Sequence, residues 1–149
     1  MPEQGSGPWL ICHRILVRFS DCDPLGHVNN ASYSTYLEQA RIVLWRKQAG
    51  IELRRAAQAG GRHGESFILA RTEIDFRSQA RDGDLLEVRL GLESFGRTSM
   101  TYRYEIAMAE TGRLVVAAKT VQVWYDYDTG KPAPLPDATK ALLSQSVTD

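Results

Sequence analysis

Residues 18–33 carry the sequence Arg-Phe-Ser-Asp-Cys-Asp-Pro-Leu-Gly-His-Val-Asn-Asn-Ala-Ser-Tyr, where the pattern of side chains changes from strand to helix. Before it, apolar and polar residues alternate from Trp9 to Phe19, as in a half-buried β-strand. Asp-Pro-Leu-Gly is typical of a turn, and Asn29 or Asn30 can cap a following helix. From Ala31 to Ala49, apolar residues recur every three or four positions, which predicts a long amphipathic helix. Its apolar stripe consists of Tyr33, Tyr36, Leu37, Ala40 and Leu44.

Four further segments alternate between apolar and polar side chains and predict strands. They comprise residues 68–77, 86–93, 100–108 and 114–125. In the first of them, Ile68 and Ala70 are expected on the same face as Thr72. Turn sequences separate the strands, and short turns join antiparallel neighbours. Because one helix covers only one face of such a sheet, we predict an α+β fold: a curved five-stranded antiparallel sheet wrapped around one long helix.

The smaller elements complete this prediction. Residues 1–149 are expected to form a single domain, with residues 1–8 as a loose lead-in. Short helices are predicted at residues 52–59 and 137–143, and Gly50 fits the end of the long helix. The glycines expected in a mobile loop are Gly60, Gly61 and Gly64.

Composition excludes several classes of protein. The chain has 149 residues, of which 43% are apolar, enough for the core of one domain. Its 18 basic and 18 acidic residues balance, which argues against general nucleic-acid binding. No apolar run approaches the roughly 20 residues of a membrane span, and the first residues lack the pattern of a signal peptide. Cys12 and Cys22 lack the partners of a zinc site, so we expect a cytoplasmic protein without a metal.

A carboxylate, Asp23, lies a few residues before the predicted helix. The first turn of a helix presents unpaired backbone N–H groups, which can hold the oxyanion that forms when a carbonyl is attacked. Gly26 lets the chain approach a ligand closely. A carboxylate and an amide donor suffice for a thioester, because its leaving thiol has a pKa of about 8.5 and departs without a general acid. The loop therefore predicts thioester chemistry.

Three segments carry a family resemblance. Residues 18–33, with Glu73-Ile-Asp-Phe76 and Arg81-Asp-Gly-Asp-Leu-Leu86, resemble the hot-dog-fold acyl-CoA thioesterases of the 4-hydroxybenzoyl-CoA thioesterase type. The resemblance extends over residues 10–127. It implies a hot-dog fold and hydrolysis of an acyl-CoA, with coenzyme A as part of the substrate and no separate cofactor. It also implies self-association as a dimer or tetramer whose subunits share their sites.

The resemblance assigns roles to individual residues. Asp23 corresponds to the catalytic carboxylate, and the backbone N–H of Asn30 to the amide donor at the helix start. Arg97 lies in a turn between two late strands, where the family offers basic residues to the coenzyme A phosphates. Thr98 and Ser99 add hydroxyl groups that suit a phosphate. An Asn-Asn pair replaces the aromatic pair of the aryl-specific members, so an aromatic acyl group is not implied.

The neighbours of Asp23 allow more than one interpretation. His27 could bind substrate or position water, although a loop histidine is more often satisfied by nearby backbone. Asp21 is expected to brace the loop. Cys22 has no adjacent base that would make it a nucleophile. Tyr33 could line a substrate pocket or belong to the core, and Gly26 is a candidate for substrate contact.

These residues leave alternative functions open. A thioesterase would use Asp23 as nucleophile or as general base, two roles that the sequence does not separate. A non-catalytic acyl-CoA-binding module would not need this carboxylate. A hot-dog dehydratase would need a His/Asp pair placed for proton abstraction, which the sequence does not make visible. The carboxylate therefore favours the thioesterase.

Overall fold

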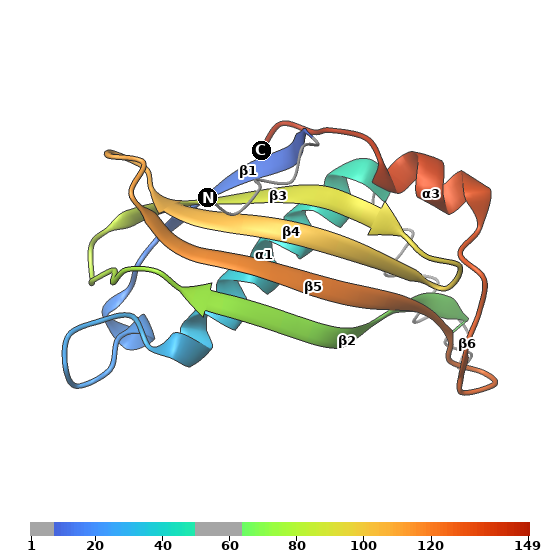
Figure 1. Cartoon of the computed structure of the whole chain (residues 1–149), viewed down its shortest axis with the longest axis horizontal. Coiled ribbons are helices and arrows are strands. Elements are labelled where there is room, and N and C mark those ends of the chain that lie inside the picture. The colour runs from blue at the N-terminus through green and yellow to red at the C-terminus, as the bar shows by residue number, and fades with distance from the viewer. Residues whose placement is uncertain (1–7, 50–63) are drawn as a thin grey trace.

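The computed structural model describes residues 8–49 and 64–149 (Figure 1). Its helices are α1 (Asn30–Ala49) and α3 (Asp137–Leu143), and a short 3-10 turn (Phe19–Asp21) precedes α1. Its strands are β1 (Trp9–Leu16), β2 (Glu65–Phe76), β3 (Leu85–Phe95), β4 (Ser99–Met108), β5 (Leu114–Asp126) and β6 (Lys131–Pro132). The helix predicted at residues 52–59 and the glycines at positions 50, 60 and 61 lie outside the described residues.

The strands form one curved antiparallel sheet in the order β1-β3-β4-β5-β2, and the short β6 pairs with β5. Helix α1 crosses behind this sheet in the view of Figure 1, so that the sheet wraps around it. The predicted α+β fold is therefore confirmed. The closing helix at residues 137–143 is also confirmed, whereas the two-residue strand β6 was not predicted.

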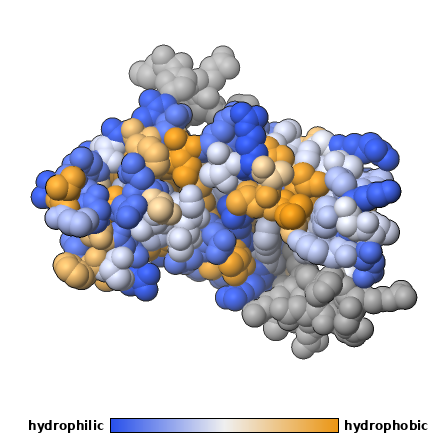
Figure 2. Space-filling model, turned by 90° about the horizontal axis from the view of Figure 1, so that it is seen from below, coloured by the Kyte–Doolittle hydropathy of each residue, from blue (hydrophilic) through white to orange (hydrophobic). Residues whose placement is uncertain are grey.

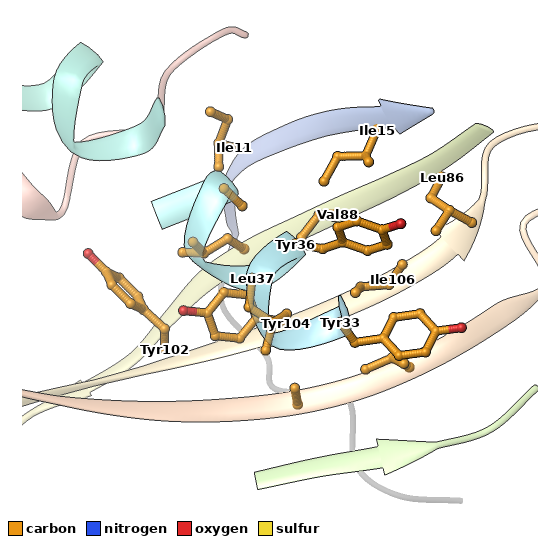
Figure 3. Close-up of a cluster of buried hydrophobic side chains, with 14 of the residues drawn as sticks. Ile11, Ile15, Tyr33, Tyr36, Leu37, Leu86, Val88, Tyr102, Tyr104 and Ile106 are labelled. Atoms are coloured by element: carbon orange, nitrogen blue, oxygen red, sulfur yellow. The ribbon is translucent and has the colours of Figure 1, made fainter. Parts of the chain in front are cut away.

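The hydrophobic core lies between α1 and the inner face of the sheet (Figure 3). All five residues of the predicted helical stripe are at most 3% exposed. Tyr102 and Tyr104 of β4 face them across the core, and the Tyr102 hydroxyl accepts a hydrogen bond of 2.8 Å from Trp45 Nε1. Burying one large apolar side chain contributes about 1.5–3 kcal/mol, so the buried side chains of this core hold α1 against the sheet.

The two edges of the sheet differ. The C-terminal segment returns beside β1, where the Val147 N–H donates 2.8 Å to the Leu10 carbonyl. Strand β2, at the other edge, leaves three large apolar side chains 41–49% exposed: Ile68, Leu69 and Phe76. Strand β2 is the lowest strand in Figure 1, and Figure 2 shows the molecule from below. On that face, apolar surface lies in separate patches between hydrophilic ones (Figure 2). Strand β1 leaves one such residue uncovered, Leu16 at 60% exposure, whereas β2 leaves three along its length.

Two sequence predictions need correction. Strand β1 ends at Leu16, because hydrogen bonds between Arg18 and Asp21 fold the next residues into the 3-10 turn and leave Phe19 83% exposed. In β2 the register shifts between Leu69 and Arg71. Leu69 pairs with the buried Gln122 and Thr72 with the buried Thr120, so these two residues of β2 share the inner face. The expected grouping of Ile68 and Ala70 with Thr72 is therefore wrong, since a bulge at this point changes the alternation.

Candidate active site

Backbone hydrogen bonds attach the loop before α1 to one end of the sheet. The Val17 N–H donates 2.9 Å to the Asp84 carbonyl, and the Val28 N–H donates 2.9 Å to the Ala80 carbonyl. Within the loop, Cys22 and Val28 form a single antiparallel bridge. The turn between them is therefore held beside the end of β2 and the start of β3.

Asp23 opens this turn and is half-buried. Its Oδ1 accepts the N–H groups of Leu25 at 2.9 Å and His27 at 3.3 Å. Its carbonyl accepts the Gly26 N–H at 3.0 Å, and Gly26 adopts a φ of 86°, a left-handed conformation that favours glycine. Within residues 8–49 and 64–149, no hydrogen bond reaches the second carboxylate oxygen of Asp23. That oxygen is therefore available to a reacting group.

The start of α1 distinguishes the two asparagines. Asn29 Oδ1 accepts the Ala31 N–H at 3.0 Å, and the Asn29 carbonyl accepts the Ser32 N–H at 2.8 Å. Asn29 is therefore the capping residue, and Asn30 is the first residue of the helix. The Asn30 N–H has no acceptor in the described part of the chain. It points from the positive end of the helix dipole and is free to bind an oxyanion.

Asp21 plays a different part in the same loop and is 7% exposed. Its carboxylate accepts the Arg18 N–H at 3.0 Å, the Arg18 guanidinium at 3.0 Å and the Tyr36 hydroxyl at 2.8 Å. Burial raises the pKa of the Asp21 carboxyl, but these hydrogen bonds outweigh burial and hold the pKa below its usual range. Its carbonyl also accepts the N–H of Asn29. Asp21 therefore braces the loop, as the sequence predicts.

The other candidates near Asp23 divide into two groups. His27 is half-buried and joins the loop through its backbone, in a bridge to Arg81, while its ring forms no hydrogen bond with any described residue. Tyr33 is 3% exposed, with its ring centre 5.8 Å from that of Phe76. Burial raises the pKa of the Tyr33 hydroxyl. Tyr33 thus belongs to the core beside the loop, whereas the ring of His27 is available to a ligand.

Arg97, Thr98 and Ser99 lie at the opposite end of the sheet from Asp23. The loop of Asp23 is held where β3 begins, and Arg97 follows the end of β3. Strand β3 has 11 residues, a length of about 36 Å at about 3.3 Å per residue. Arg97 is exposed, and its carbonyl accepts the Leu135 N–H at 2.9 Å. Within one chain, Arg97 therefore lies far from the loop of Asp23.

A cavity of about 130 Å³ lies between α1 and β2. Its lining includes Thr35, Glu38 and Arg41 from α1, and Leu69 and Thr72 from β2. Arg41 is 5% exposed and was not among the site residues predicted from the sequence. A signal was present: Arg41 follows Leu37 by four residues, so a charge lies on the apolar side of the helix.

Two general features of the described residues bear on function. No group of three or more His, Cys, Asp or Glu side chains among residues 8–49 and 64–149 is arranged to hold a metal ion. No helix in those ranges has the length and apolar character required to cross a membrane.

A protein-family model described as the thioesterase-like superfamily matches residues 17–143. The chain belongs to this superfamily. The match includes the loop of Asp23, helix α1 and every strand from β2 to β6. Hydrolysis of thioesters is therefore the reaction class of this protein, which confirms the prediction of an enzyme over a non-catalytic binding module.

Curated relatives match over most of the chain. The long-chain acyl-CoA thioesterase FadM of Escherichia coli is 30% identical over 134 residues, which cover 90% of this chain and 97% of FadM. The acyl-CoA thioester hydrolase YbgC of Escherichia coli is 28% identical over 135 residues, which cover 88% of this chain and 93% of YbgC. These matches confirm the resemblance to the acyl-CoA thioesterases.

Solved structures agree with the fold. A 1,4-dihydroxy-2-naphthoyl-CoA thioesterase from Synechocystis superposes with a TM-score of 0.79 and 25% identity, covering 89% of this chain and 93% of that one. A thioesterase from Thermus thermophilus, solved with coenzyme A and zinc, has a TM-score of 0.76 and 31% identity, with 91% and 98% covered. The hot-dog fold is therefore confirmed.

Proposed function

We propose that this protein hydrolyses an acyl-CoA to the free acid and coenzyme A, with Asp23 as the catalytic carboxylate and the Asn30 N–H as the oxyanion donor. One observation carries the proposal: a carboxylate oxygen and a helix N-terminal N–H, seven residues apart in one loop, both lack partners in the described residues. His27 is the second candidate in the loop, because its ring is also available to orient a water molecule.

The reaction can follow either of two routes. As a nucleophile, Asp23 would attack the thioester carbon, the C–S bond would break, and water would hydrolyse the resulting mixed anhydride. As a general base, Asp23 would take a proton from water while the water oxygen attacks, and it would lose this proton to solvent after the thiolate has left. In both routes the carbonyl oxygen becomes an oxyanion, which the Asn30 N–H stabilises. The thiolate leaves without a general acid, because its thiol has a pKa of about 8.5.

Release of free thiol from a panel of acyl-CoAs tests the proposed function directly. We expect steady-state release with a stoichiometric amount of free acid, whereas binding without release would contradict the proposal. A single turnover in oxygen-18 water, with enzyme in excess, can identify the nucleophilic route. A general base always places the heavy oxygen in the acid. A nucleophile can instead leave it on Asp23, where peptide mass spectrometry would detect it.

Self-association through β2 is part of the same proposal. The C-terminal segment bonds to the opposite edge at Leu10, whereas β2 leaves Ile68 and Phe76 partly exposed. Exposed apolar edge strands pair with other chains. We expect light scattering to report a dimer or a tetramer, and a fully active monomer would contradict it. The free thiols of Cys12 and Cys22 fit the cytoplasmic location that the sequence predicts.

A second chain would also bring Arg97 to the site. If two β2 strands pair antiparallel, the hairpin end of one sheet lies beside the loop end of the other. In that arrangement, Arg97→Ala should raise the KM for an acyl-CoA about tenfold, equal to about 1.4 kcal/mol. The KM for a pantetheine thioester, which lacks the nucleotide phosphates, should change little. Equal effects on both substrates would show that Arg97 makes no phosphate contact.

A further inference from the structure

Arg41 is a buried charge in an otherwise apolar part of α1 and is 5% exposed. Its Nη1 donates 3.2 Å to the Tyr104 hydroxyl, which is itself hydrogen-bonded to Thr120 at 2.8 Å. None of the ion pairs formed by residues 8–49 and 64–149 includes Arg41. A guanidinium has five N–H donors, and the described residues accept one of them; Nε and Nη2 are not among the fully buried nitrogens without a partner, so they keep some contact with solvent. A charge buried in this way is unfavourable unless an opposite charge pairs with it.

Arg41 lines the 130 Å³ cavity between α1 and β2. This cavity begins one turn into α1, at Ser34, and reaches Arg41. Asn30 and Arg41 are 11 residues apart, or about 16 Å along the helix axis. An acyl chain whose carbonyl lies at the Asn30 N–H could therefore extend along α1 toward Arg41. A cavity of about 150 Å³ accommodates a benzene molecule, so this one suits a small end group.

The other charged group of the cavity is Glu38, one turn before Arg41. Glu38 is exposed, so water screens its charge, whereas the charge of Arg41 is buried and screened less. Thr35 and Thr72 add neutral hydroxyl groups to the lining. The field inside the cavity is therefore dominated by the positive charge of Arg41.

We propose that Arg41 selects acyl groups with a carboxylate at the far end, so that the preferred substrates are coenzyme A monothioesters of dicarboxylic acids. This inference rests on the proposed function, because it places the thioester carbonyl at the start of α1. The distal carboxylate would accept charge-assisted hydrogen bonds from the guanidinium. An unsubstituted acyl chain would leave the buried charge of Arg41 unpaired.

The test compares dicarboxylic monothioesters of coenzyme A, from four to twelve carbons, with monocarboxylic thioesters of the same length. At one chain length, we expect the ratio of kcat/KM for the diacid to that for the monoacid to fall at least tenfold in Arg41→Met. Glu38→Gln is the matched control on the same helix, and it should raise the ratio because it removes the opposing charge. An unchanged ratio in Arg41→Met at every length would overturn the proposal.

A measurement on the wild-type enzyme keeps the test valid if Arg41→Met does not fold. The methyl ester of each dicarboxylic substrate has a similar shape but no charge. The wild type should hydrolyse the free carboxylate at least tenfold more efficiently than this ester at the preferred length, and equal rates would overturn the role of Arg41. Failure of the proposed function itself is distinguishable, because no thioester of either kind would then release thiol.

Discussion

Asp21 and Asp23 lie two residues apart in the loop before α1, and their carboxylates have different surroundings. Asp21 is 7% exposed, and both of its oxygens accept hydrogen bonds from Arg18 or Tyr36. Asp23 is half-buried, and only Oδ1 accepts hydrogen bonds from described residues. Since hydrogen-bonding capacity used for structure is unavailable for chemistry, Asp21 is expected to control stability and Asp23 to control rate.

The largest expected effect is on catalysis. Asp23→Asn removes the charge needed to attack carbon or take a proton, so kcat should fall at least about 100-fold. Thermal stability should change little, because the amide oxygen of asparagine can still accept the N–H groups of Leu25 and His27. Steady-state thiol release and a thermal melt measure the two quantities. A variant with near-wild-type kcat would move the catalytic role to another residue, with His27 the next candidate.

Asp21→Asn should have the opposite pattern. The substitution weakens the charge-assisted hydrogen bonds from Arg18, which should lower the free energy of unfolding by about 2 kcal/mol. The value of kcat should fall much less than in Asp23→Asn. Urea unfolding and thiol release on the same preparation make the comparison. Unchanged stability together with a large loss of kcat would show that Asp21, not Asp23, is the reacting carboxylate.

The pH dependence of thermal stability should also show that Asp21 stabilises the loop. The pKa of Asp21 is lower in the folded protein than its ordinary value of 3.8, so the unfolded chain binds a proton more readily. The resulting stabilisation is present above pH 3.8 and is lost as the pH falls through the folded pKa. Melting temperatures of the wild type and Asp21→Asn should therefore differ by a constant amount at neutral pH and approach each other as the pH falls below 3.8. A gap that stayed constant at acid pH would contradict the lowered pKa.

Features that depend on neighbouring residues could be predicted from the sequence. The spacing of Tyr33, Leu37 and Leu44 fixes the buried side of α1, and all three are at most 3% exposed. The turn at Asp23 follows from Asp-Pro-Leu-Gly, whose residues bond to one another. Local side-chain chemistry determines both features.

Features that depend on distant pairing could not be predicted. The bulge in β2 arises from its register with β5, which places Leu69 opposite Gln122. The partner of Asp21 is Tyr36, 15 residues away, and the side of α1 that Arg41 faces is defined only when β2 packs beside it. Antiparallel packing also separates Arg97 from Asp23, which sequence order does not indicate.

Tyr36→Phe should lower stability less than Asp21→Asn does. It removes a buried hydrogen bond of 2.8 Å and should cost about 1–1.5 kcal/mol of stability. The cost should shrink in an Asp21→Asn background, because the two side chains interact directly. Tyr33→Phe is the control, since the hydroxyl that bonds to Asp21 is that of Tyr36 and not that of Tyr33. Equal costs in both backgrounds would mean that this hydrogen bond does not hold the loop.

The smallest expected effect, on the Asp23 side, comes from Gly26→Ala, and Gly83 offers a matched control. Both glycines have a φ of 86°, and a Cβ atom at either position would meet nothing within 4 Å. Alanine at either site should therefore cost about 1–2 kcal/mol of stability through backbone strain alone. Only Gly26→Ala strains the turn that holds Asp23, so it should lower kcat several-fold while Gly83→Ala leaves kcat near the wild-type value. Equal kcat in the two variants would show that the reaction does not depend on the geometry of this turn.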